Sequence, residues 1–202
     1  MNELSSRLKS DLIDQWESLN LALTEQVAVN PGRSEHTRIA GKIAADLHSI
    51  IKRPDVTLSP ESVGQHDLSL IREIADASKA SIFASAAKKD LLSVTAYFEA
   101  DGNGKYKFLR NAMVIDNRRT EQQDLLEVVK RVGSGLIDAL KLDLVWEPQI
   151  NTSPAPFEDQ VVLRSPTDAG TSVNVQFFKR NPEGDLEKYD PKSWQFNLLP
   201  PA

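Results

Sequence analysis

The sequence contains no cysteine in its 202 residues. This absence excludes disulfide bonds, thiolate catalysis and zinc sites built on cysteine. Histidine is also scarce: only His36, His48 and His66 occur, and none of them has the i, i+4 partner of a helical metal site. We therefore predict no metal site and no cofactor for this chain.

Long apolar runs are absent as well. No stretch reaches the roughly 18 apolar residues that a membrane span requires, so no span is predicted. Residues 1–16 contain early acidic residues and no apolar run, which is not the pattern of a secretory signal. We expect a cytoplasmic protein with no membrane partner.

An excess of positive charge is the third absence. The chain has 24 basic and 29 acidic residues, which gives a net charge of −5 at pH 7. Because general nucleic-acid binding depends on neutralising phosphates, this balance argues against it, and only a local basic patch stays open as an alternative. The hydrophobic content of 40% is typical of a globular protein with a sizeable core.

What is present is organised around residues 91–115, where the pattern predicts a β-hairpin. Residues 93–98 and 105–115 are rich in β-branched and aromatic side chains, which favour strands. Between them, Asp-Gly-Asn-Gly at 101–104 supplies the positive φ angles that tight turns require. A turn centred on any of its three dipeptides shifts the pairing in steps of two residues, so each side chain keeps its face.

The two faces of the predicted hairpin differ. The expected core face carries Leu92, Val94, Ala96, Phe98, Leu109, Met113 and Ile115, interrupted by Lys107 and Asn111. On the other face, Tyr97, Tyr106, Phe108 and Arg110 cluster near the turn. Aromatic and arginine side chains are enriched at the centres of protein interfaces, so this cluster is a candidate binding surface. The alternative is that other strands or a helix of the same chain cover it.

A helix is predicted over residues 120–142. Thr120, with Gln123 three residues later, fits a capping box. An apolar stripe follows at helical spacing and consists of Leu125, Val128, Val129, Val132, Leu136 and Leu140. Gly133 and Gly135 lie within this helix and indicate a kink, a break or a close approach by another backbone.

Residues 1–54 predict a helical hairpin. A long apolar stripe runs over residues 4–27 and includes Leu12, Trp16 and Leu19. Residues 34–53 form a second helix, with Ser34 as its cap and Pro54 after its end. The stripe is a candidate site for a protein partner or a second copy of the chain, and packing against the rest of the fold is the alternative.

A third helix is predicted over residues 67–89, and strands are predicted after residue 143. The expected strands cover 144–146, 161–163, 173–177 and 186–189. Near the C-terminus, Trp194, Phe196 and Leu198 alternate with polar residues. This alternation indicates an edge strand or an extended tail packed on the core.

No recognised catalytic motif is present. Gly133-Ser134-Gly135 lacks the spacing of a phosphate loop or a nucleophile elbow. A calcium loop starting at Asp101 fails because Ala112 stands where a glutamate ligand is required. A site joining His48 and His66 requires the loop between them to fold back.

We predict an α+β fold: an N-terminal helical hairpin plus a third helix, then a mainly antiparallel sheet with one long helix packed on it. The helical hairpin, residues 1–54, is one domain and residues 55–202 form an α+β domain, or the two parts are continuous.

The predicted function is that of a non-enzymatic protein-interaction module, such as an adaptor, assembly factor, chaperone-like protein or inhibitor. Its protein partner or second copy is expected to contact Leu12, Trp16, Leu19, Tyr97, Tyr106, Phe108 and Arg110. The alternative is RNA or single-stranded DNA binding, in which Tyr106 and Phe108 stack on bases and nearby cations contact phosphates. An enzyme with a site assembled from distant residues is the third alternative.

Overall fold

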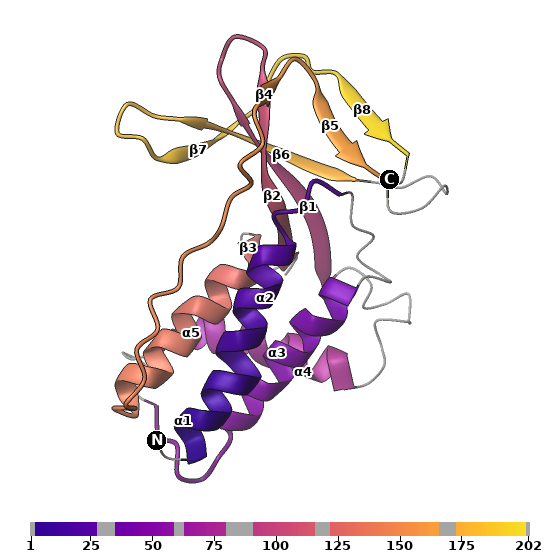
Figure 1. Ribbon diagram of the computed structural model, residues 1–202. Coiled ribbons are helices and arrows are strands. Elements are labelled where there is room, and N and C mark those ends of the chain that lie inside the picture. The colour runs from indigo at the N-terminus through magenta and orange to yellow at the C-terminus, as the bar shows by residue number, and fades with distance from the viewer. Residues whose placement is uncertain are drawn as a thin grey trace.

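The computed structural model describes residues 3–27, 35–58, 63–79, 91–115, 122–165 and 173–200. Helices gather at one end of the molecule and strands at the other, and the hairpin extends from one group into the other (Figure 1). The predicted α+β class is confirmed. No helix within these ranges is long and apolar enough to cross a membrane.

The first helical segment consists of α1 (Glu3–Leu8), a π-helical turn η1 (Lys9–Ile13) and α2 (Asp14–Ala22). Leu8, Leu12 and Trp16 recur every four residues, which is more than the 3.6 residues of an α-helical turn, so this stripe would drift around an α-helix. The wider π turn brings the stripe back toward one face. The segment ends at Ala22 rather than at the predicted Val27.

The other helices are α3 (Glu35–Ile51), α4 (Gln65–Lys79) and α5 (Leu125–Ala139). The first two confirm the second and third predicted helices, while Ser34 and residues 80–90 lie outside the described ranges. The predicted start of α5 is wrong. Its N-cap is Asp124, whose carboxylate accepts a hydrogen bond from the N–H of Leu126 at 2.9 Å. Thr120 lies outside the described residues.

The strands form two sheets. The larger has the order β3-β2-β1-β6-β7, with β4 also paired to β2. The predicted hairpin of β1 (Leu92–Ala100) and β2 (Tyr106–Ile115) is confirmed; the other strands are β3 (Gln123–Asp124), β4 (Phe157–Glu158), β6 (Asn174–Arg180) and β7 (Leu186–Tyr189). Only β1 and β6 pair in parallel, so this sheet is mainly antiparallel, as predicted. The smaller sheet pairs β5 (Val161–Arg164) with β8 (Phe196–Leu199) in parallel.

The strand predicted at residues 144–146 is wrong. These residues belong to an extended connection that runs along the helices from α5 toward β4 (Figure 1). Trp146 packs there, and a Cβ atom added at Gly133 would lie 2.5 Å from its ring. Gly133 therefore allows a close approach, by a side chain rather than by a backbone. The side chain of Asn20 holds the connection through hydrogen bonds to Gln149 and Asn151.

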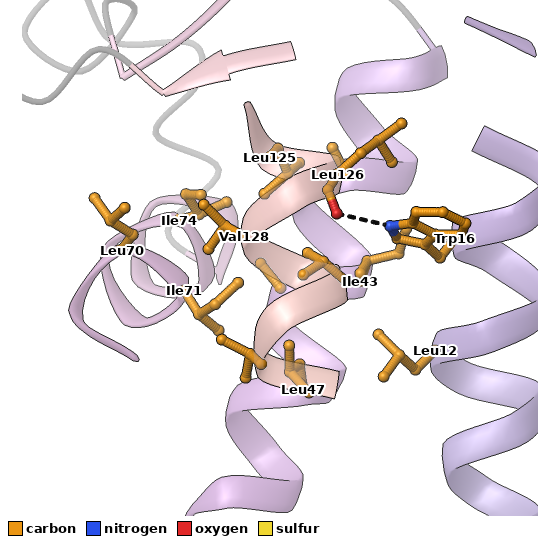
Figure 2. Close-up of a cluster of buried hydrophobic side chains, with 14 of the residues drawn as sticks. Leu12, Trp16, Ile43, Leu47, Leu70, Ile71, Ile74, Leu125, Leu126 and Val128 are labelled. Carbon is orange, nitrogen blue, oxygen red and sulfur yellow. Dashed lines mark hydrogen bonds between the residues drawn. The ribbon is translucent and has the colours of Figure 1, made fainter. Parts of the chain in front are cut away.

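Two apolar clusters fill the interior. The helical core joins the four helical segments to the end of the hairpin that is far from its turn, at Leu92, Val94, Met113 and Ile115. Figure 2 shows the centre of this core. The strand core lies between the two sheets and consists of Ala96, Phe98, Ala100, Tyr106, Phe108, Val161, Leu163 and Phe177. β1 and β2 contribute to both cores, so the hairpin connects the two ends of the molecule.

Candidate functional site

The apolar stripe of the first helical segment lies inside the helical core. Leu12 and Leu19 are fully buried, and Trp16 is 1% exposed. The indole N–H of Trp16 donates a hydrogen bond to the carbonyl oxygen of Leu126 in α5 at 3.0 Å (Figure 2). All three side chains pack within their own chain, which was the predicted alternative, and they leave no surface for a partner.

A bulge in the hairpin redistributes the predicted aromatic cluster. Tyr97 pairs with Arg110, whereas the next residue of β1, Phe98, pairs with Phe108, so Leu109 is the extra residue. One extra residue exchanges the two faces of β2 on the turn side of the bulge. Tyr106 and Phe108 therefore lie on the core face, and Leu109 is not part of the regular alternation that was predicted.

Tyr106 and Phe108 are consequently part of the strand core. Phe108 is 1% exposed and contacts Phe98, with the ring centroids 5.5 Å apart. Tyr106 is 5% exposed, and its hydroxyl donates a hydrogen bond to the carbonyl oxygen of Ser193 at 3.0 Å. Neither ring is available to stack on a nucleic-acid base, which requires an accessible ring face.

Arg110 and Tyr97 lie together on the opposite face, as predicted, but Arg110 is buried. Its guanidinium forms an ion pair with the carboxylate of Asp124 and lies 5.3 Å from the centroid of the Tyr97 ring. Burial raises the pKa of Asp124, and Arg110 offsets part of this rise. Burial also raises the pKa of Tyr97 to about 12, with the charge of Asp124 adding to the effect.

This buried group connects structural elements. Asp124 binds Arg110 of β2 and also caps α5 through Leu126. The side chain of Asp124 is only 9% exposed, so a substrate has little access to this carboxylate. The group therefore fixes α5 on the hairpin, and it does not form a binding surface.

The two histidines of the third alternative have different surroundings. His48 lies within α3 and is buried, whereas His66 lies in the first turn of α4 and is exposed. In the part of the chain that the structure describes, no group of three or more histidine, aspartate or glutamate side chains could hold a metal ion. The positions of His48 and His66 therefore do not support an enzymatic site.

Aromatic side chains reach the surface in the C-terminal segment instead. Trp194 and Phe196 are each 42% exposed. Their ring centroids are 6.1 Å apart, and the ring of Trp194 lies 5.1 Å from that of Phe177 in the strand core. The exposed pair thus extends the strand core to the surface of the molecule.

A cavity of about 300 Å³ opens between the hairpin turn and the segment that leads into β8. Its lining includes Gly102, Gly104, Tyr106, Tyr189 and residues 190–193. Residue 193 immediately precedes Trp194, so the surface is hollowed next to the aromatic pair. The hydrogen bond between Tyr106 and Ser193 holds this wall of the cavity in place.

The backbone of β8 pairs with β5 on one side only, as far as the described residues show. The N–H groups of Val161 and Ser165 donate to the carbonyl oxygens of Gln195 and Leu199, both at 2.8 Å. Successive residues of a strand direct their N–H and C=O groups to opposite sides. The backbone groups of 195, 197 and 199 therefore point toward β5, and those of Phe196 and Leu198 point away from it. Within the described ranges, no strand pairs with this outer side, which is open in Figure 1.

The edge strands β7 and β8 differ in charge. β7, at the edge of the larger sheet, carries Glu187 and Lys188, whereas the segment from Ser193 to Leu199 has no charged residue. Charged side chains on an edge strand oppose pairing with another chain. β7 is protected in this way and β8 is not.

Of the two alternatives for the alternating residues near the C-terminus, the structure shows the edge strand, over Phe196–Leu199, and the sequence analysis did not select it as a site. The uncharged run beside alternating aromatic residues was the signal available in the sequence. Searches for similarity return no family model, no curated protein and no solved structure that matches this chain. A proposal for its function depends on the geometry described above.

Proposed function

We propose that this chain is a protein-interaction module that binds an extended protein segment at the outer edge of β8. The outward N–H and C=O groups of Phe196 and Leu198, beside the half-exposed rings of Trp194 and Phe196, carry this proposal. An added strand would satisfy these backbone groups, and the rings would contact every second side chain of that strand. The expected ligand is an extended segment with apolar residues at alternating positions.

The proposal keeps the predicted class of function and places it on a different surface. Nucleic-acid binding receives less support, because Tyr106 and Phe108 are buried and the β8 edge has no cation to contact phosphates. The missing charge instead favours an apolar partner that pairs through its backbone.

Selection of displayed random linear peptides on the immobilised chain tests this proposal. Enriched peptides are expected to show apolar residues at alternating positions. Their affinity, measured by fluorescence anisotropy, should fall at least tenfold for Phe196→Lys. Leu186→Lys is the matched control, because Leu186 is similarly exposed, at 37%, on the edge strand β7. Failure to enrich any peptide, or equal binding to both variants, would disprove the proposal.

A further inference from the structure

We infer that the partner at the β8 edge is a second copy of this chain, joined in an antiparallel pair with two-fold symmetry. The inference rests on the proposed function and names the partner for the same edge. It follows from three features of β8: the direction of its backbone groups, the side chains on each of its faces and its lack of charge.

Symmetry leaves few registers for such a pair. The two-fold axis is perpendicular to the sheet, so the side chains of two residues that lie opposite each other point to the same face. Because side chains alternate between faces along a strand, the sequence numbers of these two residues must differ by an even number. Phe196 opposite Leu198 of the second copy meets this condition. Both residues direct their N–H and C=O groups outward, so each such pair forms two hydrogen bonds, and the pair occurs twice.

The neighbouring symmetric registers are less favourable. A pair centred on Leu198 sets Phe196 opposite Pro200, which has no N–H to donate. A pair centred on Phe196 sets Leu198 opposite Trp194, which lies outside the strand. Only the register centred on Asn197 satisfies all outward groups of the strand.

The side chains suit this register. Phe196 would lie beside Leu198 of the second copy on the face that packs on the strand core, and such apolar cross-strand pairs are stabilising. Asn197 would meet its own equivalent on the other face, where two amides can exchange hydrogen bonds. The exposed rings of Trp194 and Phe196 would lie next to the new strand.

The edge of β7 does not offer the same solution. A symmetric pair centred on either middle residue of β7 sets Glu187 opposite Glu187 or Lys188 opposite Lys188. Like charges directly opposite each other destabilise a strand pair. Of these two edge strands, β7 carries charges that oppose self-pairing and β8 does not.

Charge substitution at Asn197 tests the inference, because the two copies of this residue face each other only in the symmetric pair. Sedimentation equilibrium of the wild-type chain should give 44.8 kDa, twice the 22.4 kDa of one chain. Asn197→Lys and Asn197→Asp should each give 22.4 kDa, and a 1:1 mixture of the two variants should recover 44.8 kDa. Glu187→Lys, on the β7 edge, is the control and should remain dimeric.

Three results would overturn the inference: a monomeric wild-type chain, single variants that remain dimeric, or a mixture that stays monomeric. Asn197 is exposed, so its charged variants are expected to fold, and recovery in the mixture would show that both are intact. The outcome is separable from the proposed function. A monomer that still binds selected peptides through Phe196 removes the second copy as partner and leaves the proposed function standing, whereas a monomer that binds no peptide removes both.

Discussion

At the scale of single residues, Arg110 neutralises a carboxylate that the fold has removed from water. The side chains of Arg110 and Asp124 are each 9% exposed. Removing one partner of a buried ion pair leaves an uncompensated charge and costs about 3–5 kcal/mol, whereas replacing both partners costs much less. The two residues are therefore required as a pair.

Arg110→Met should reduce the free energy of unfolding at pH 7 by about 3–5 kcal/mol. Because Arg110 lowers the pKa of Asp124, its loss raises that pKa further. The folded state then retains a proton that the unfolded state releases, so the deficit is complete above the pKa of Asp124 in the folded variant and shrinks as the pH falls below it. Urea unfolding at pH 7 and pH 4 measures the difference.

The double variant Arg110→Met/Asp124→Asn is the control for this prediction. Asparagine keeps an oxygen that can cap α5 but carries no charge. We expect the double variant to be more stable at pH 7 than Arg110→Met alone. A single variant with the same deficit at both pH values, and no recovery in the double variant, would contradict the role of the buried charge.

At the scale of elements, α2 contains a matched pair of leucines. Leu19 is fully buried in the helical core, and Leu21, two positions later, is 65% exposed. Leu19→Asp should destabilise the fold by more than about 4 kcal/mol, because it places a carboxylate without a partner in the core. Leu21→Asp should change stability by about 0.5 kcal/mol or less. Urea unfolding followed by circular dichroism gives both values.

The same variants decide between the two explanations of the first apolar stripe. If Leu19→Asp stayed fully folded and changed only the molar mass, the stripe would be an interface after all. The burial of Leu12, Trp16 and Leu19 leads us to expect unfolding instead.

The register of β2 against β1 was only partly predictable from the alternation of side chains. Beyond the bulge, Ala96 pairs with Asn111 and Val94 with Met113, which is the register of a turn centred on Asn103-Gly104. Nearer the turn the loop occupies residues 101–105, and Leu109 compensates for the difference. Alternation could not reveal this bulge, because β2 is almost continuously buried and has apolar residues on both of its faces.

The helices and most strands follow from local periodicity, but their partners do not. The capping box predicted at Thr120 and the cap observed at Asp124 meet the same local preference, and side-chain chemistry alone does not rank them. Trp146 ends a short apolar run typical of a strand, yet its side chain packs on Gly133 and Trp16, and its backbone belongs to no strand. For the same reason the alternation near the C-terminus indicated a strand or an extended tail but not its exposure, which depends on what the rest of the chain covers.

At the scale of the whole molecule, residues 23–27 connect the end of the first helical segment to both sheets. The side-chain N–H₂ of Asn111 in β2 donates to the carbonyl oxygens of Glu25 and Val27, each at 3.0 Å. On the other side, the N–H of Arg164 in β5 donates to the carbonyl oxygen of Gln26 at 3.1 Å. Asn111 therefore holds the segment against which the smaller sheet is positioned.

Asn111→Ala should destabilise the protein by about 1–2 kcal/mol, because two carbonyl groups lose their donors. Within the smaller sheet, the loss of protection from hydrogen exchange should differ between residues of β5. Hydrogen exchange should accelerate at the amide of Arg164, which depends on Gln26, and stay unchanged at the amide of Val161, which binds Gln195. Equal acceleration at both amides would show that residues 23–27 do not transmit the change.

The parallel pairing of β1 with β6 has a consequence for synthesis of the chain. Thr95 pairs with Asn174, a separation of 174 − 95 = 79 positions, whereas β2 follows β1 directly. At about 5–20 residues per second, a ribosome needs about 4–16 s to add that length. During this time the strand destined for the centre of the sheet has one side with no partner from its own chain. The nascent protein thus passes through a stage in which one edge of β1 is open to its neighbours on the polysome.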